Sequence, residues 1–297
     1  MAARPSVEPT GATALRQLGL VVHPTRRVDA ALGEIERWAS SHGFALGQIR
    51  IPGQERAVAE PVEAASCDLL IAVGGDGTAL TALHAGAEYS CPVLAVACGS
   101  LGVLTSVRVD RLTWALEQVS AGRWTPLNVP GLDVSWDDTH GGVAINDVAI
   151  VRDRPGQIIV SVSADGVLYA RVAGDGLVVA TPLGSSAYTI AAGGPILAPG
   201  ADGTVVTPLA PHGGFCPPLV AGAESRLAIT IEAGYVGVRC ELDGRRVPVG
   251  GELMLVSRRP EYATLVSLAE EEPRLSGLRR RGIVLDSPRV LVRDNRV

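Results

Sequence analysis

The stretch Cys67–Thr78, CDLLIAVGGDGT, decides the fold because it joins a buried strand to a glycine-rich turn. Its first part, Cys67–Val73, is apolar apart from Asp68, which is typical of a strand covered on both faces in a parallel sheet. Gly74–Thr78 interrupts that run, and Ala79–Ala87 then predicts a helix. A strand, a glycine turn and a helix in this order predict an anion-binding edge of an α/β layer.

The segments around this stretch continue the alternation of strands and helices. The apolar residues of Val28–Ser41 recur at helical spacing, and Gly43 is expected to end that helix. We therefore predict an α/β domain with a Rossmann-like parallel sheet over residues 18–124, after a flexible tail at residues 1–17. The other strands of this domain are expected at Leu18–Val22, Gln48–Ile51 and Pro92–Ala97.

The texture of the sequence changes after about Trp124. Short runs rich in Val and Ile, separated by Gly, Asp and Pro, predict a largely antiparallel, β-rich domain over residues 125–272. We expect a ligand in the cleft between the two domains, and residues 273–297 to pack back on the first domain. The runs that predict strands are Leu132–Trp136, Gly142–Val151, Gln157–Ala164, Val167–Ala173, Leu177–Ala180, Leu227–Glu232, Val236–Leu242 and Glu252–Ser257.

Composition and charge argue against several classes of function. The formal net charge of −5 argues against a nucleic-acid partner, which requires a concentrated basic face. No apolar stretch is long enough to span a membrane, and Met1–Gln17 has no signal-peptide pattern, so we expect neither a membrane nor a secretory role. The five cysteines lack metal-type spacing, which favours a reducing cytoplasm. All 26 basic residues are arginine, which excludes Schiff-base chemistry and the lysine of a Walker-type loop.

Asp76 stands inside the glycine turn, where its charge would repel a bound phosphate. Its position is explained if the carboxylate holds a metal ion or accepts a proton from an attacking hydroxyl group. Gly74, Gly75 and Gly77 would allow the backbone to approach a ligand without a Cβ in the way. The alternative is a tight turn in which Asp76 caps the following helix.

Five stretches carry a resemblance to a known family. Gly74–Thr78 resembles the GGDGT loop of the NAD kinases and, more distantly, of the diacylglycerol and sphingosine kinases. Gly99–Thr105 (GSLGVLT) is similar to a second NAD-kinase signature, and the Gly-Thr-x-Asn-Asp stretch of the lipid kinases is missing. Asn146-Asp147 and Pro211-His212 resemble the family's Asn-Glu or Asn-Asp pair and its Pro-His pair. The longest match is Gly174–Pro195 (GDGLVVATPLGSSAYTIAAGGP), which resembles the family's DG…TPTGSTAY…GGP pattern with most positions in register.

The resemblance implies an ATP-dependent NAD kinase that phosphorylates the 2′-hydroxyl of the adenosine ribose of NAD to give NADP. Asp76 is then the catalytic residue, and Mg²⁺ is expected with ATP, near Asp76 rather than at a fixed protein site. A homodimer or homotetramer is also implied, with the site completed by a neighbouring subunit. The phosphate-binding residues are expected to be Gly74, Gly75, Gly77 and Thr78. The substrate-binding residues are expected to be Asn146, Asp147, Asp175, Thr181, Gly184, Ser185, Ser186, Ala187, Tyr188 and His212.

The chain departs from the family pattern at Ala97, Val103, Leu183 and Ala191, around the implied acceptor pocket. Each hydrogen bond lost to a ligand is worth about 0.5–1.5 kcal/mol, so several losses could change the acceptor. Several alternatives stay open. The acceptor could be NADH, the donor could be polyphosphate, or the protein could be a related kinase that acts on a nucleoside, sugar or lipid. A non-catalytic sensor of NAD or NADP also stays open. Asp243-Gly244 is assigned only a hairpin turn.

Overall fold

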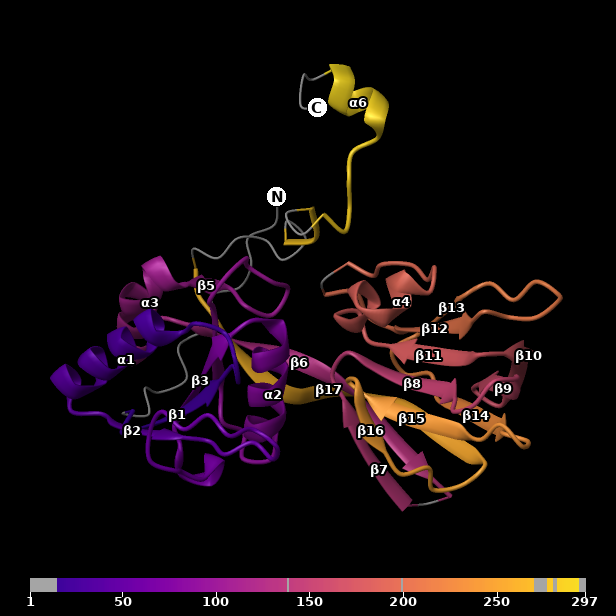
Figure 1. The fold of residues 1–297 in the computed structure, drawn as a ribbon, viewed down its shortest axis with the longest axis horizontal. Coiled ribbons are helices and arrows are strands. Elements are labelled where there is room, and N and C mark those ends of the chain that lie inside the picture. The colour runs from indigo at the N-terminus through magenta and orange to yellow at the C-terminus, as the bar shows by residue number, and fades with distance from the viewer. Residues whose placement is uncertain (1–14, 138, 199, 270–276, 280–281, 294–297) are drawn as a thin grey trace. The chain divides into compact units, whose positions relative to one another are not determined.

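The computed structural model describes residues 15–137, 139–198, 200–269, 277–279 and 282–293. The chain divides into two compact units, Met1–Asn128 with Ala263–Val297 and Val129–Tyr262. Strands β6 (Thr125–Trp136) and β17 (Leu253–Ser267) each begin in one unit and end in the other (Figure 1).

Most of the predicted tail, residues 1–14, lies outside the described residues, as do residues 270–276, 280–281 and 294–297. In the observed division the second boundary follows Tyr262, earlier in the chain than the predicted end of the β-rich domain at residue 272.

The first unit is the predicted α/β layer. Its parallel strands follow the order β17-β4-β3-β1-β2, with β5 beside β4. Helix α1 ends at Gly43, whose φ of +74° is the left-handed conformation predicted for a glycine C-cap. The elements of this unit are β1 (Gln17–Val22), α1 (Asp29–His42), β2 (Ala45–Gln48), β3 (Leu69–Gly74), α2 (Asp76–Ala87), β4 (Val93–Ala97), β5 (Val107–Arg108), α3 (Leu112–Ser120) and, near the C-terminus, α6 (Pro288–Arg293).

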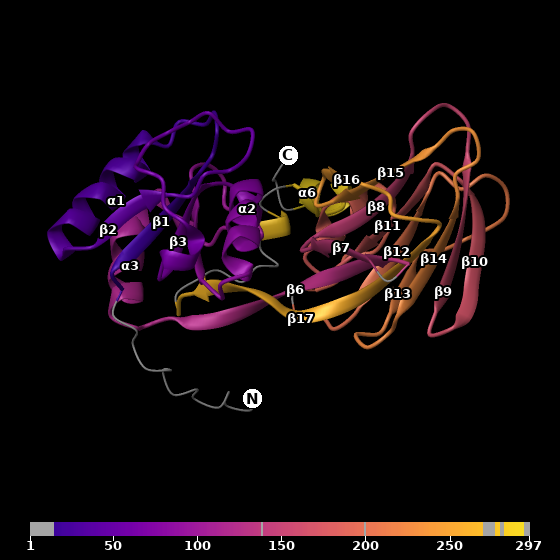
Figure 2. The ribbon, with the colours of Figure 1, turned by 90° about the horizontal axis from the view of Figure 1, so that it is seen from below.

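Helices cover both faces of this parallel sheet, with α1 and α3 on one side and α2 on the other (Figure 2). Successive strand residues point to opposite faces of the sheet, and both faces are covered by helices. β3 is therefore buried along its whole length, as its apolar sequence predicted. Ile35 of α1 and Leu116 of α3 are fully buried in the core of the first face. None of the described helices is long and apolar enough to cross a bilayer.

The second unit is a sandwich of two antiparallel sheets, which agrees with the predicted β-rich class. One sheet has the order β10-β9-β14-β17, continued by β6 and β7, and the other β13-β12-β11-β8-β15-β16. Inward-facing apolar side chains such as Val160, Ile229, Ile150 and Leu177 fill the space between them. The remaining elements are β7 (Thr139–Ala144), β8 (Asp147–Arg152), β9 (Ile158–Ala164), β10 (Val167–Gly174), β11 (Gly176–Ala180), α4 (Tyr188–Ala191), β12 (Thr204–Leu209), β13 (Leu219–Ala221), β14 (Leu227–Glu232), β15 (Val238–Leu242) and β16 (Arg245–Val247).

Several predicted strands differ from the structure. The runs Leu132–Trp136 and Glu252–Ser257 belong to longer strands, because β6 begins at Thr125 and β17 continues to Ser267. The run Gly142–Val151 forms two strands rather than one, because the chain turns at Ile145 and Asn146, whose amides bind the Asp243 carboxylate. The strand expected at Gln48–Ile51 is β2, which ends at Gln48. There Gln48 pairs with the segment around Pro61, its N–H donating to Glu60 O and its carbonyl oxygen accepting the Val62 N–H.

Candidate functional site

The predicted glycine turn lies at the carboxyl end of the buried strand β3, where α2 begins. A Cβ on Gly74 would lie 2.3 Å from Thr78 Oγ1, so only glycine lets the first turn of α2 pack this closely on the strand end. Thr78 is buried, whereas Gly77 is exposed. Backbone amides at a helix N-terminus favour a bound anion.

A cavity of about 290 Å³ opens beside this turn, within the first unit. Its lining includes Gly75, Asp76, Thr78, His23 and Arg26. His23 directly follows β1 and Gly75 follows β3, and these two strands are neighbours in the sheet. Open α/β sheets bind their ligands outside the carboxyl ends of such strands, so the cavity occupies the expected position for a nucleotide phosphate.

His23 organises one wall of the cavity. Its Nδ1 accepts hydrogen bonds from the N–H groups of Thr25, at 3.2 Å, and Arg26, at 3.1 Å. Burial, then the charges of Arg26 and Arg56, lower the pKa of the His23 imidazole below its usual value. The ring is therefore neutral at pH 7, and because Nδ1 is the acceptor its proton sits on Nε2.

Asp76 joins the two glycine signatures of the first unit. Its Oδ2 accepts the Val103 N–H at 2.8 Å, and its Oδ1 accepts the N–H groups of Leu104 and Thr105, both at 3.1 Å. A Cβ on Gly102 would lie 1.8 Å from Asp76 Oδ1, so glycine is required for this approach. The segment Gly99–Thr105 is thereby held against the phosphate turn, and the Asp76 carboxylate has a fixed position at the cavity.

A second set of predicted residues meets in the β-rich unit, at the turn between β7 and β8. The Asp243 carboxylate accepts the N–H groups of Ile145 at 2.8 Å, Asn146 at 2.6 Å and Asp147 at 3.2 Å. From the sequence, Asp243 is assigned only a hairpin turn, and these hydrogen bonds are not predicted. Nothing local in the sequence connects residue 243 with residue 146, so no sequence signal could have revealed this contact.

The Asp147 side chain is buried, with 6% of its surface exposed. Burial, then the nearby charge of Asp243, raises the pKa of the Asp147 carboxyl group to about 7, although the Tyr188 backbone N–H bonded to it acts in the opposite direction. The group therefore exchanges its proton near neutral pH. Depending on pH, it can donate a hydrogen bond to a ribose hydroxyl or accept one from it.

The loop Thr181–Tyr188 is packed directly on the Asn146 turn. Thr181 Oγ1 donates to Ile145 O at 2.7 Å, and a Cβ on Gly184 would lie 1.8 Å from Asn146 O. Thr181 and Ser185 are fully buried, and their hydroxyl groups bond to the backbone of the same region. Ser186 Oγ likewise donates to Leu183 O at 3.0 Å. Ala187 and Tyr188 are the exposed members of the loop, which leaves the Tyr188 ring accessible for stacking.

Asp175 and His212 lie elsewhere. Asp175 precedes β11 and Thr181 follows it, so a strand of five residues, about 17 Å long, separates the two. The Asp175 carboxylate pairs with Arg152 at 2.6 Å, and His212 Nδ1 is 2.8 Å from Gln157 Oε1. Within the β-rich unit the structure therefore brings together Asn146, Asp147 and the 181–188 loop, but not Asp175 and His212.

A GGDGT turn in an α/β unit and an Asn-Asp pair in a β sandwich are the arrangement that the resemblance to the GGDGT kinases predicts. Residues 18–124 match the family model of the ATP-NAD kinase N-terminal domain, and residues 145–248 match that of the ATP-NAD kinase C-terminal domain.

Individual relatives agree with this class. The chain is 33% identical to the NAD kinase of Azotobacter vinelandii and 35% identical to that of Pseudomonas putida, in each case over 208 residues that cover 67% of this chain and 70% of the relative. Yeast NADH kinase, solved in complex with NADH, has a similar structure, with a TM-score of 0.78 at 22% identity over 95% of this chain and 94% of that one. An NAD kinase from Archaeoglobus fulgidus in complex with ATP has a TM-score of 0.71 at 22% identity, over 91% and 100%. The chain belongs to the NAD kinase family.

Proposed function

We propose that this ATP-dependent kinase transfers the γ-phosphoryl group of ATP to the 2′-hydroxyl of the adenosine ribose of NAD, giving NADP and ADP. Family membership supports the reaction class. The observation that carries the proposal is the position of Asp76, at the phosphate cavity and bonded to the amides of Val103–Thr105.

In the proposed reaction the ribose oxygen forms a bond to the γ-phosphorus while the bond from that phosphorus to the β,γ-bridging oxygen breaks. The hydroxyl proton passes to the Asp76 carboxylate, and ADP leaves with the bridging oxygen. Little covalent chemistry falls to the protein, so positioning supplies most of the rate. The fixed position of Asp76 suits that task.

We assign the ribose to the Asn146 turn. Within the described residues the Asn146 side-chain amide makes no hydrogen bond, so its donor and acceptor remain available to vicinal hydroxyls. Asp147 lies beside it with a proton that exchanges near pH 7. The exposed Tyr188 ring offers a face for a base. Thr181, Gly184, Ser185 and Ser186 then act by shaping this turn.

Mg²⁺ is expected to bind with ATP, through the phosphates. Among the described residues, no group of three or more His, Cys, Asp or Glu side chains is placed to hold a metal ion. Asp76 is the one carboxylate among the described residues that line the cavity, and both of its oxygens accept backbone hydrogen bonds. These residues do not fit a resident metal site, and we derive no step through one.

An oligomer that shares its sites would explain the position of Asp175. Asp175 and His212 lie at the opposite end of β11 from the Asn146 turn, so in one subunit they do not adjoin the proposed ribose site. We propose a homodimer or homotetramer in which they face the dinucleotide bound by a neighbour. A cytoplasmic location is proposed from the free cysteines among the described residues.

A panel of acceptors tests the proposed reaction. The full-length protein is incubated with γ-labelled ATP, Mg²⁺ and either NAD, NADH, a nucleoside, a sugar or diacylglycerol. We expect label in NADP, with ³¹P NMR placing the new phosphate at the 2′ position. Label in another acceptor alone would contradict the proposal, and NAD binding without any labelled product would identify a sensor. Replacing ATP with polyphosphate in the same assay tests the donor.

A further inference from the structure

The Arg26 guanidinium lies over the ends of two neighbouring strands, at the cavity beside the glycine turn. Its Nη1 is 3.1 Å from the position a Cβ would take on Gly75 and 3.7 Å from that on Gly99. Gly75 follows β3 and Gly99 comes shortly after β4, and these strands are adjacent and parallel. Arg26 is itself part of the cavity lining.

The charges around this cavity favour a protein cation in addition to the Mg²⁺ expected with ATP. ATP would bring several negative charges to a cavity whose lining already includes the Asp76 carboxylate. The N-terminus of α2 contributes only about half of a positive charge. Lysine, the usual alternative, is absent from the whole chain. The guanidinium of arginine offers paired N–H groups that match two phosphate oxygens.

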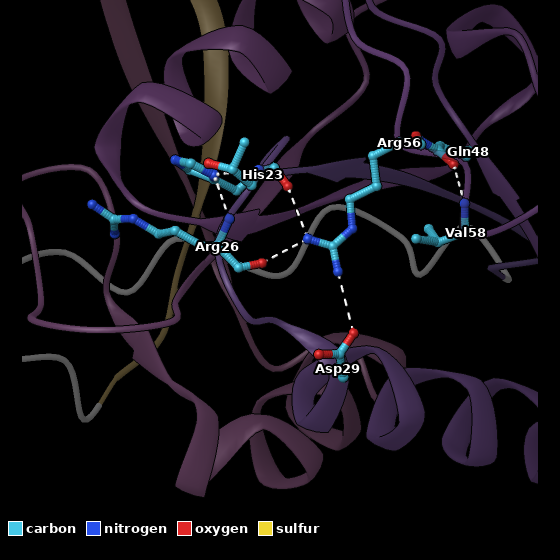
Figure 3. Close-up of polar contacts among 7 residues, drawn as sticks. His23, Arg26, Asp29, Gln48, Arg56 and Val58 are labelled. Atoms are coloured by element: carbon cyan, nitrogen blue, oxygen red, sulfur yellow. Dashed lines mark hydrogen bonds and ion pairs between the residues drawn. The ribbon is translucent and has the colours of Figure 1, made fainter.

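Arg26 is exposed, and its guanidinium forms no hydrogen bond or ion pair with any other described residue. Its backbone, in contrast, is held firmly. Arg56 Nη1 donates to Arg26 O at 2.6 Å and to His23 O at 3.3 Å, while Arg56 Nη2 pairs with Asp29 at 3.2 Å. Figure 3 shows the Arg56 guanidinium between this turn and Asp29, with the Arg26 side chain extending in another direction.

The residue that holds the turn is itself anchored to the sheet. The Gln48 side chain, at the end of β2, donates to Arg56 O at 2.7 Å and accepts the Val58 N–H at 2.7 Å (Figure 3). Gln48 is buried, with 8% of its surface exposed. A chain of contacts thus runs from the sheet through Arg56 to the backbone of Arg26. These contacts fix the backbone of Arg26 and leave its guanidinium group available to a ligand.

We propose that Arg26 binds the phosphate chain of the ATP donor and that Arg56 is the positioning residue that holds the Arg26 turn in place. This inference rests on the proposed function, because it assigns the donor to the cavity of the first unit. It predicts that removal of the charge at Arg26 weakens the binding of ATP and leaves the binding of NAD unaffected. The proposed ribose site is built from residues of the other unit.

Arg26→Gln tests the proposal, with Arg27→Gln as the matched control. Arg27 is the adjacent exposed arginine and does not belong to the described lining of the cavity. For Arg26→Gln we expect the KM for ATP and the Kd for ATP, measured by calorimetry without NAD, to rise about tenfold or more. The KM for NAD should stay within about twofold. Arg26→Lys should restore part of the ATP affinity, because it restores the charge without the paired N–H groups.

Arg56→Gln separates positioning from direct contact. We expect Arg56→Gln to lower the affinity for ATP less than Arg26→Gln does. The double variant should bind ATP as well as Arg26→Gln alone, because Arg56 acts only through the Arg26 turn. Thermal unfolding of each variant checks that the fold is retained.

Equal ATP affinity in Arg26→Gln and Arg27→Gln would overturn the proposal, as would a rise confined to the KM for NAD. The calorimetric arm separates this inference from the proposed function. Wild-type protein that binds ATP in an Arg26-dependent way but makes no NADP would contradict the function and leave the Arg26 assignment standing. NADP formation that is insensitive to the replacement of Arg26 would contradict the Arg26 assignment and leave the proposed function standing.

Discussion

At the residue scale, close approaches that only glycine permits fix the positions of Asp76 and of the Asn146 turn. Asp76 can reach the amides of Val103–Thr105 because Gly102 lacks a Cβ, and Gly184 allows the 181–188 loop to touch Asn146. The sequence motifs had identified these glycines. Their partners were not predictable, because each contact joins residues that are distant along the chain.

Gly102→Ala should displace the Asp76 carboxylate, since the added methyl group would lie 1.8 Å from Oδ1. We expect kcat to fall at least tenfold and the free energy of unfolding to fall by about 1–3 kcal/mol. Gly33→Ala, in the middle of α1, is the control, because its Cβ would meet only the flexible end of Arg37. That control should be neutral or stabilising by up to about 1 kcal/mol. Unaltered kcat in Gly102→Ala would show that Asp76 does not need its observed position.

The buried Asp147 should make stability depend on pH. Its pKa is raised from 3.8 to about 7 in the folded state, so the folded protein binds the extra proton between those values. Stability should therefore fall as pH rises through this window, and the penalty is complete above about pH 7. Asp147→Asn should abolish the slope and stabilise the protein at pH 8 by an amount on the order of a few kcal/mol.

Urea unfolding at pH 5 and pH 8 measures this effect, with exposed Glu224→Gln as a variant that should keep the wild-type slope. If Asp147→Asn retained that slope, the raised pKa would have to be reassigned to another group.

At the element scale, what could be predicted was local. The apolar run before Gly74 predicted β3, the helical spacing of residues 28–41 predicted α1, and Gly43 predicted its end. Helix α3 was not anticipated, although its apolar residues Leu112, Ala115, Leu116 and Val119 follow helical spacing. The split of Gly142–Val151 into β7 and β8 could not be predicted, because it depends on a carboxylate that lies about a hundred residues later in the chain.

The hairpin between β15 and β16 should stabilise the proposed ribose site as well as the sandwich. Asp243→Ala removes the acceptor for three amides at residues 145–147. We expect a loss of about 2–4 kcal/mol in the free energy of unfolding and a higher KM for NAD. Gly244→Ala, which has a φ of +72°, should strain the same hairpin by about 1–2 kcal/mol yet leave the KM for NAD unchanged. Equal effects of both variants on that KM would assign Asp243 a purely structural role.

At the scale of the whole molecule, the two units were predictable from the change in sequence texture near Trp124, and each belongs to the predicted class. A return of the chain to the first domain was expected at residues 273–297. The return through β17 comes earlier and was not predicted, because Leu265 pairs with Val93, which is distant along the chain. The sequence motifs predicted which residues belong to the candidate site but not how these residues are arranged. The separation of Asp175 and His212 from Asn146 became apparent only from the order of the strands.

Mixing two inactive variants tests whether neighbouring subunits share a site. Asn146→Ala and Asp175→Ala should each be nearly inactive. An equimolar mixture, unfolded and refolded together, should regain about a quarter of the wild-type activity, because a quarter of the sites would combine an intact Asn146 with an intact Asp175. Refolding each variant alone is the control. A mixture without regained activity would mean that both residues serve the same subunit or that Asp175 is not in a site.

The most direct test of the account is NADP formation by Asp76→Asn in the presence of ATP, Mg²⁺ and NAD. Because Asp76 is proposed to accept the hydroxyl proton, we expect kcat to fall by about 10²–10⁴-fold. Asp110→Asn, at an exposed carboxylate paired with Arg108, should keep the wild-type rate. A correctly folded Asp76→Asn protein that makes NADP within a few-fold of the wild-type rate would contradict the role of Asp76.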